Sequence, residues 1–250
     1  MNWHHRYLVQ AGWTRELRTY LFQKAGFSSA RRVLEVGCGT GAILCDESQD
    51  HSKLNSDTGR YGIDRSAATL DECRIHAPGA FLTRGDAVNL PYADNSFDIT
   101  YCHYLLLWVN DPFSTLIEMK RVTKLKGYII ALAEPDYISR VDQPEEISWL
   151  GKRQTQSLME QGADVRIGSR VADLFYEAGI NILETGIIKN RNKEALTSEE
   201  WENEWAVLIA DLAGIIAKEE MQEMKHLDEQ AWRHGEHEMY IPTYFAWGQV

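Results

Sequence analysis

The chain has 250 residues, of which 44% are hydrophobic, and its formal net charge at pH 7 is −11. This length and composition suit one globular α/β domain, with or without a covering lid. The negative charge opposes phosphate backbones, and no cluster of Lys and Arg offsets it, so we expect no nucleic-acid partner.

Membrane and secretion signals are missing from the sequence. No apolar run approaches the ~20 residues of a membrane span, and residues 1–6 lack the apolar core of a signal peptide. The four cysteines form no C-x-x-C pair, and no His or Cys pair has zinc-ligand spacing. We therefore expect a cytoplasmic protein with reduced thiols, no membrane association and no metal site.

The first part of the chain combines helical spacing with one buried strand. Apolar residues recur at helical intervals over 3–27, and Gly26 is a suitable helix stop. A strand is predicted at 31–36 and the start of a helix at 42–45. The polar stretch 48–59 predicts a loop or a frayed helix end.

The most informative segment is 33–41, VLEVGCGTG, a strand that runs straight into a glycine-rich turn. Gly37, Gly39 and Gly41 lack the Cβ that would keep a ligand away from the backbone. Amides at the start of the following helix can meet negative charge. Glu35 precedes the glycines, where its carboxylate would repel a phosphate. The turn therefore favours a ligand with hydroxyl or ammonium groups over a diphosphate.

The spacing of the glycines alone is also compatible with a dinucleotide as the ligand. The dinucleotide fingerprint is G-x-G-x-x-G, and Ala42 is an allowed residue at its third position. Asp64 ends the strand predicted at 61–63, where it suits the ribose hydroxyls of either ligand. Asp86 follows the strand predicted at 80–83 and can accept a hydrogen bond from an adenine amino group.

Helix and strand signals alternate through the middle of the chain. Ser66 is a good N-cap for a helix over 67–76, and a strand at 98–102 follows the loop at 91–95. Pro112 opens a helix that reaches 122. The apolar run 127–133 is typical of a parallel strand covered on both faces. Further helices are predicted at 144–162, 170–178, 198–217 and 218–233, and further strands at 180–189 and 240–248.

Four motifs, in order, resemble those of class I S-adenosylmethionine-dependent methyltransferases. They lie within residues 31–135 and are Glu35 to Gly41, Asp64, Gly85-Asp86-Ala87 and Asn95-Ser96-Phe97-Asp98. One departure is Lys124-Leu125-Lys126-Gly127, where the family usually has a Lys-Pro-Gly-Gly turn. This turn lies away from the expected cofactor site, so the departure leaves the expected chemistry unchanged.

The resemblance and the alternating elements imply an α/β fold with a doubly wound, seven-stranded, mostly parallel sheet and a helical lid. The last two strands would form an antiparallel edge pair, separated in sequence by a helical insertion. We divide this single domain into an N-terminal helical cover at 1–30, a cofactor-binding core at 31–189, an insertion or lid at 190–237 and a final edge strand at 238–250.

The resemblance also implies S-adenosyl-L-methionine as cofactor and S-adenosyl-L-homocysteine as product. Asp64 and its neighbour Arg65 would lie at the ribose and Asp86 at the adenine amino group, with an amide supplied by Ala87. Glu35 would contact or orient the methionine amino group, and the backbone at Cys102 and His103 would face that ammonium. The full expected cofactor set is Glu35, Gly37, Gly39, Gly41, Asp64, Arg65, Asp86, Ala87, Cys102 and His103.

Candidate catalytic residues follow the fourth and fifth predicted strands, at the rim where open α/β sheets bind ligands. His103 is a candidate base near the methyl group, and Glu134, Asp136 and Tyr137 are candidates to take a proton from a substrate or to orient it. The alternatives are a packing histidine and a capping loop.

Two helical stretches are candidates to cover the site. Tyr7, Gln10 and Trp13 lie on the first helix, which often covers the cofactor in this family. Trp201, Glu204 and Trp205 could face a hydrophobic substrate, although helix packing is the favoured interpretation of this stretch.

We expect methyl transfer to a small, uncharged or cationic acceptor with an apolar body, because the chain is acidic and its expected lid is rich in Trp, Tyr and Leu. One alternative is a regulatory or scaffold protein that binds S-adenosylmethionine without catalysis. Another is an enzyme that uses this fold for a reaction other than methyl transfer.

Overall fold

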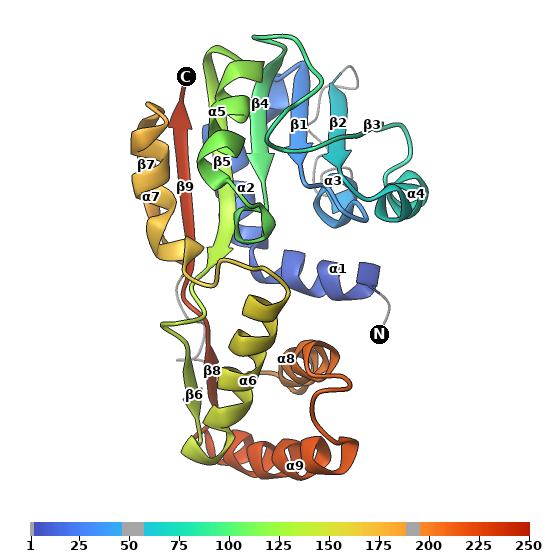
Figure 1. The fold of residues 1–250 in the computed structure, drawn as a ribbon, viewed down its shortest axis with the longest axis vertical. Coiled ribbons are helices and arrows are strands. Elements are labelled where there is room, and N and C mark those ends of the chain that lie inside the picture. Colours follow the sequence, from blue (N-terminus) through green and yellow to red (C-terminus); the bar gives the residue numbers. More distant parts are fainter. Residues whose placement is uncertain (1–2, 47–57, 189–195) are drawn as a thin grey trace.

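The computed structural model describes residues 3–46, 58–188 and 196–250. Its main feature is a seven-stranded sheet with the order β3-β2-β1-β4-β5-β9-β7 (Figure 1). β9 runs antiparallel to both of its neighbours, and all other pairs in this sheet are parallel. The strands are β1 (Arg32–Val36), β2 (Gly59–Asp64), β3 (Phe81–Arg84), β4 (Phe97–Cys102), β5 (Thr123–Pro135), β7 (Asn181–Ile188) and β9 (Thr243–Gln249). The predicted doubly wound sheet and its antiparallel edge pair are confirmed.

Helices cover both faces of the sheet because successive side chains of each buried strand point to opposite sides. Leu34 of β1 belongs to a core cluster that includes residues of α5 (Pro112–Val122) and α7 (Ile167–Glu177). The preceding residue, Val33, packs instead with Phe22 of α2 (Arg15–Lys24) and Phe27 of the short helix η1 (Phe27–Ser29). These residues are almost fully buried, so each contributes about 1.5–3 kcal/mol of hydrophobic stabilisation.

The helix starts follow the capping residues that the sequence offers. The Ser66 hydroxyl accepts a hydrogen bond from Thr69 N at the start of α4 (Ala67–His76), as predicted. Asp111 does the same for Ser114 N in α5, ahead of Pro112 at the first helical position. The shorter α3 (Ala42–Asp46) begins directly after the glycine turn. Most of the loop predicted at 48–59 lies outside the described residues.

The ends of the chain differ most from the predicted elements, and the helix predicted at 198–217 ends earlier, at Asp211. The helical stretch at 3–27 is divided into α1 (Trp3–Trp13), α2 and η1, with a break at Thr14. The final strand predicted at 240–248 begins only at Thr243, because the residues before it form a separate strand, β8 (Glu238–Tyr240). β8 pairs with β6 (Val141–Gln143), which the sequence did not predict.

A group of elements lies beyond the carboxyl ends of the parallel strands, and α1 lies between it and the sheet (Figure 1). We call this group the cap. It consists of β6, the short helix η3 (Glu145–Ile147), α6 (Ser148–Glu160), α8 (Ser198–Asp211), α9 (Lys218–His234) and β8.

The cap has an apolar cluster of its own, which includes Leu150, Trp201, Trp205 and Met221. The short helix η3 and α6 therefore pack with the insertion, although they fall within the range 31–189. The domain division itself stays a prediction.

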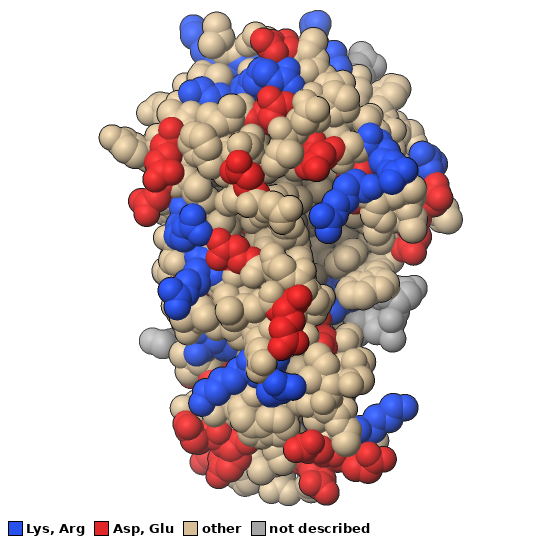
Figure 2. Space-filling view, in the orientation of Figure 1, with Lys and Arg blue, Asp and Glu red and all other residues tan. Residues whose placement is uncertain are grey.

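Acidic residues are prominent on the outer end of the cap. Figure 2 shows Asp and Glu gathered at that end of the molecule and no continuous basic face on the side in view. Within residues 3–46, 58–188 and 196–250, no helix is long and apolar enough to cross a membrane. The same residues contain no cluster of three His, Cys, Asp or Glu side chains with metal-binding geometry.

Candidate functional site

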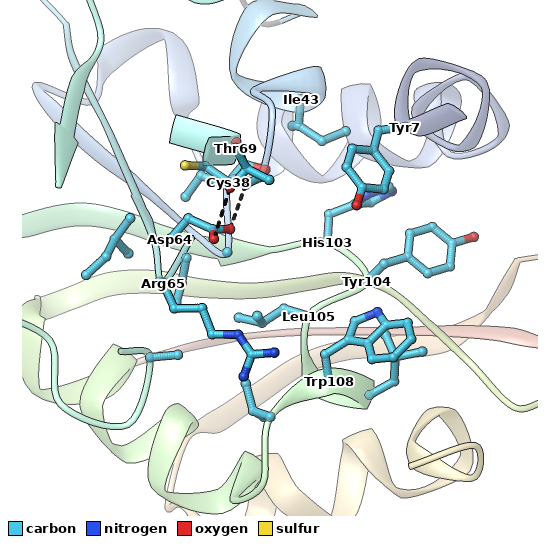
Figure 3. A pocket seen from close by; sticks show the side chains of 18 of the residues that line it. Tyr7, Cys38, Ile43, Asp64, Arg65, Thr69, His103, Tyr104, Leu105 and Trp108 are labelled. Carbon is cyan, nitrogen blue, oxygen red and sulfur yellow. Dashed lines mark hydrogen bonds between the residues drawn. The ribbon is translucent and has the colours of Figure 1, made fainter. Parts of the chain in front are cut away.

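A cavity of about 670 Å³ opens at the carboxyl ends of β1, β2 and β4, under α1. Its volume lies in the range of small-molecule and cofactor sites. Figure 3 shows Asp64 and Arg65 on one side and Tyr104 and Trp108 on the other, with Tyr7 and His103 between helix and sheet. The predicted residues that line it are Glu35, Gly37, Gly39, Asp64, Arg65, Asp86, Ala87 and His103, together with Tyr7, Gln10 and Tyr137.

Asp64 joins the glycine turn to the start of α4. Its Oδ2 accepts a hydrogen bond from Gly39 N at 2.9 Å, and its Oδ1 accepts one from Ser66 N at 2.9 Å. The Thr69 hydroxyl donates a weaker bond to the same Oδ1 at 3.3 Å (Figure 3). The carboxylate therefore fixes the shape of the turn while it still faces the cavity.

The three glycines of the turn serve different purposes. All three have positive φ, but only Gly37 and Gly39 line the cavity. A Cβ on Gly41 would lie 2.7 Å from Cys73 Sγ of α4. Gly41 is therefore required by packing between the turn and α4, and the structure does not bring it to the cavity as the sequence had suggested.

Glu35, Arg65 and Asp86 differ in their exposure at the cavity. Glu35 is 2% exposed, and the Tyr101 hydroxyl lies 3.5 Å from its Oε2. Arg65 and Asp86 are exposed at the outer end, where Asp86 Oδ1 accepts a hydrogen bond from Val88 N. The cavity thus has a buried carboxylate at its inner end and charged side chains of both signs at its mouth.

Cys102 differs from its neighbour His103, because its side chain is fully buried and does not line the cavity. Its Sγ lies 4.0 Å from Glu134 Oε1. Of these two residues, the structure therefore brings only His103 to the cavity.

His103 is held by the first helical segment. Its Nε2 lies 2.9 Å from the Thr14 hydroxyl, at the break between α1 and α2. Burial, assisted by the nearby Arg18 guanidinium, lowers the pKa of His103 to about 3. The imidazole is therefore neutral at physiological pH, and so weak a base is poorly matched to proton abstraction there.

A second cavity, of about 170 Å³, adjoins the first. The two share Gln10, Tyr104 and Tyr137 in their walls. The remaining wall is mostly apolar and comes from α1, the ends of β5 and β7, the start of β9 and the cap. It comprises Trp13, Pro135, Ile188, Leu196, Val207, Leu208, Met239, Tyr240 and Ile241, with Thr14, Gln154, Glu200, Glu204 and Thr243 as polar residues.

Tyr137 and Asp136 are adjacent in sequence but have different environments. Tyr137 lies where the two cavities meet, and burial raises its pKa to about 12, so its phenol can donate but does not act as a base at neutral pH. The buried Asp136 lines neither cavity. Its Oδ1 accepts hydrogen bonds from Ile138 N and Ser139 N, which is the arrangement of a capping loop.

Glu134, the other acid that the sequence offers after the fifth predicted strand, lines neither cavity and instead holds the loop that forms part of the cavity wall. Its Oε1 accepts hydrogen bonds from Leu105 N and Leu106 N at 3.0 Å, and its Oε2 accepts one from Leu107 N at 3.3 Å. Leu105 and Leu107 line the first cavity, the latter within the short helix η2 (Leu106–Trp108). A buried acid directly after an apolar strand was the available signal for this role.

Burial raises the pKa of Glu134 from 4.5 to about 7, despite the three amide hydrogen bonds that lower it. The folded protein therefore binds this proton more tightly than the unfolded chain does. Its contribution to stability is complete below about pH 4.5 and is lost as the pH rises through 7, a change of roughly 3 kcal/mol.

We expect the variant Glu134→Gln to lose this component, so its unfolding free energy falls less than that of the wild type between pH 5 and pH 7.5. Urea unfolding at both pH values measures the difference. The exposed Glu177→Gln on α7 is the control and should keep the wild-type dependence. An equal pH dependence in Glu134→Gln and wild type would show that Glu134 does not titrate in this range.

Part of the chain matches a known family of protein domains. Residues 34–131 match the family model described as "Methyltransferase domain". A protein of Renibacterium salmoninarum named demethylmenaquinone methyltransferase is 33% identical over 123 residues, 49% of either chain. A protein of Desulfotalea psychrophila named ubiquinone/menaquinone biosynthesis C-methyltransferase is 33% identical over 129 residues, 50% of either chain. The chain thus matches about half the length of these curated relatives.

Solved structures share the fold over most of the chain. A putative sarcosine dimethylglycine methyltransferase from Galdieria sulphuraria superposes with a TM-score of 0.61 at 16% identity, over 94% of this chain and 84% of that one. The [4+2]-cyclase SpnF superposes with a TM-score of 0.58 at 19% identity, over 94% and 80%. With the sheet order, the comparisons lead to one conclusion: residues 34–131 form a methyltransferase domain, and the chain has the fold of solved methyltransferases.

Proposed function

We propose that the protein transfers a methyl group from S-adenosylmethionine to a small-molecule acceptor. The observation that carries this proposal is the pair of adjoining cavities, which meet at Gln10, Tyr104 and Tyr137. The larger one has the polar groups expected for a nucleoside and an amino acid. The smaller one is mostly apolar and suits the body of an acceptor.

The residues of the larger cavity fit the cofactor by their chemistry. Asp64 would accept hydrogen bonds from the ribose hydroxyls, and Asp86 with the backbone at Ala87 would meet the adenine edge. The buried carboxylate of Glu35 lies at the inner end, where the ammonium of the methionine portion would be stabilised by a negative group. Gly37 and Gly39 would let the backbone approach the ligand closely.

Catalysis would rest mainly on alignment. The bound cofactor supplies an electrophilic methyl group, and the protein holds the acceptor atom in line with it and excludes water. Tyr137 would donate a hydrogen bond to the acceptor from its protonated phenol. His103, being neutral, would position Thr14 and the helix break instead of removing a proton.

An apolar acceptor is supported by the composition of the smaller cavity. Several relatives are named for demethylmenaquinone or for ubiquinone/menaquinone biosynthesis, and we extend only the general class, an apolar small molecule, to this chain. SpnF, named a [4+2]-cyclase, has the same fold, so a reaction other than methyl transfer is the competing catalytic assignment.

Calorimetry with three ligands tests the choice of cofactor. We expect S-adenosylmethionine and S-adenosylhomocysteine to bind and NAD not to bind, because the buried carboxylate of Glu35 at the inner end of the cavity would favour an ammonium group and repel a diphosphate. Tight binding of NAD with no heat from S-adenosylhomocysteine would overturn the proposal.

A further inference from the structure

A chain of charged side chains inside the cap ends at the smaller cavity. Asp228 of α9 is fully buried, and its Oδ1 lies 2.7 Å from His237 Nδ1. The other nitrogen of that ring, Nε2, lies 3.0 Å from Glu204 Oε2 of α8. Glu204 in turn lines the smaller cavity but not the larger one. The three residues, which we call the cap relay, thus connect the cap interior with the proposed acceptor site.

The inner end of the cap relay is tightly held. Asp228 Oδ2 accepts hydrogen bonds from Trp201 Nε1 at 2.8 Å and from Trp205 Nε1 at 2.5 Å. The Asp228 carboxylate therefore uses one oxygen for two indoles and the other for the imidazole. This satisfied arrangement fixes the ring of His237, whose side chain is only 2% exposed.

The cap relay carries an excess of negative charge. Burial alone would lower the pKa of His237, but its hydrogen bonds to Asp228 and Glu204 raise it to about 9, so the ring is a cation at neutral pH. One cation then faces two carboxylates. Burial also raises the pKa of Glu204, and His237 opposes that rise.

Neighbouring elements do not cancel this excess. Arg140 and Asp142, at β6, form an ion pair with each other, with Arg140 Nε 2.7 Å from both carboxylate oxygens. Gln154 of α6 also receives a hydrogen bond from Arg140 and donates one to Asp211 Oδ2. The cap relay therefore keeps a net negative charge, and Glu204 is its member that lines the smaller cavity.

A second carboxylate in the wall of the smaller cavity, that of Glu200, stabilises the start of α8. Glu200 lies one helical turn before Glu204 on α8, so both face the smaller cavity. Glu200 Oε2 accepts hydrogen bonds from Thr197 N and from the Thr197 hydroxyl, which makes it part of the capping box of α8. Glu204 is thus the acid that the fold presents toward a ligand, while Glu200 is engaged at the start of α8.

We propose that the smaller cavity selects acceptors with an apolar body and a protonated amine, and that Glu204, positioned by His237 and Asp228, binds the ammonium group. This inference deepens the proposed function and rests on it. An apolar wall with one oriented carboxylate suits such an organic cation, because a charge-assisted hydrogen bond in a partly desolvated site is stronger than a neutral one.

Binding of matched probes tests the proposal. With the protein saturated by S-adenosylhomocysteine, the titrants are 2-phenylethylamine and its neutral isostere 2-phenylethanol. We expect the amine to bind the wild type about tenfold or more tightly than the alcohol. In Glu204→Gln the affinity for the amine should fall about tenfold while the affinity for the alcohol changes little. Glu204→Asp should recover part of the preference for the amine. Glu202→Gln, which removes an exposed carboxylate on the same helix that lines neither cavity, should keep the preference of the wild type.

Each outcome bears on a separate claim. Equal binding of both probes, or tighter binding of the alcohol, by a wild type that binds S-adenosylhomocysteine overturns this inference and leaves the proposed function standing. A wild type that binds no S-adenosylhomocysteine overturns the proposed function itself. Loss of S-adenosylhomocysteine binding or of cooperative thermal unfolding in Glu204→Gln would identify a folding defect. The role of Glu204 would then be tested by the relative affinities of Glu204→Asp and of the wild type for the two probes.

Discussion

Asp64→Ala is expected to weaken binding of S-adenosylhomocysteine by about ten- to a hundredfold, equivalent to roughly 1–3 kcal/mol. Two effects contribute. The ribose hydroxyls would lose their acceptor, and Gly39 N and Ser66 N would lose the carboxylate that holds the turn against α4. Isothermal titration calorimetry measures the change in affinity directly.

The control for this variant is Asp71→Ala. Asp71 lies on the same helix, α4, but its side chain is 73% exposed and pairs with Arg74 on the surface. Its removal should leave the affinity within about twofold, since exposed ion pairs contribute little. Equal affinities of Asp64→Ala and Asp71→Ala would mean that Asp64 does not contact the ligand.

Asp228→Asn is expected to have the largest effect on stability, a loss of roughly 3–5 kcal/mol in the free energy of unfolding. The substitution keeps the shape of the side chain but leaves the His237 cation without its buried counter-charge. It also replaces an oxygen that accepts from Trp201, Trp205 or His237 by an amide nitrogen that cannot accept. Urea unfolding at pH 7 measures the loss.

The pH dependence gives an independent check on the cap relay. His237 has a raised pKa of about 9 in the folded protein, against 6.5 as its ordinary value. Its contribution to stability is therefore fully present below about pH 6.5 and is lost as the pH rises through 9. We expect this loss in the wild type and a smaller one in Asp228→Asn.

Glu202→Gln serves as the control for Asp228→Asn, because Glu202 is exposed and forms an ion pair with Lys225 across the same two helices. Its removal should cost no more than about 1 kcal/mol. A cost for Asp228→Asn as small as that of Glu202→Gln would contradict the view that the cap relay is buried and satisfied.

The sheet could be predicted from the sequence because each strand and each helix start is specified by residues that are neighbours in the chain. A buried parallel strand such as β1 needs a short apolar run, and Ser66 and Pro112 mark helix starts by their own chemistry. The β6–β8 pair carries no such mark, since each strand has three residues and no apolar alternation. The break at Thr14 is also not marked by a Gly or Pro at that position, and Gly12, two residues earlier, lies inside α1.

The candidate site was predictable where a motif and a strand end coincide, as at Asp64. Gly41 shows the limit of that reasoning, because a glycine that packs against Cys73 and a glycine that admits a ligand have the same sequence signature. Glu204 shows another limit. Its partners, His237 and Asp228, come from different elements far along the chain, and only the folded cap brings them together.

The most direct test of the account follows the methyl group itself. Methyl-labelled S-adenosylmethionine is incubated with the protein and a metabolite extract, and the label is then located in small-molecule and macromolecular fractions. The account predicts enzyme-dependent label in the small-molecule fraction, strongly reduced by Asp64→Ala and retained by Asp71→Ala. Binding of S-adenosylhomocysteine without label in any fraction, or label confined to macromolecules, would contradict it.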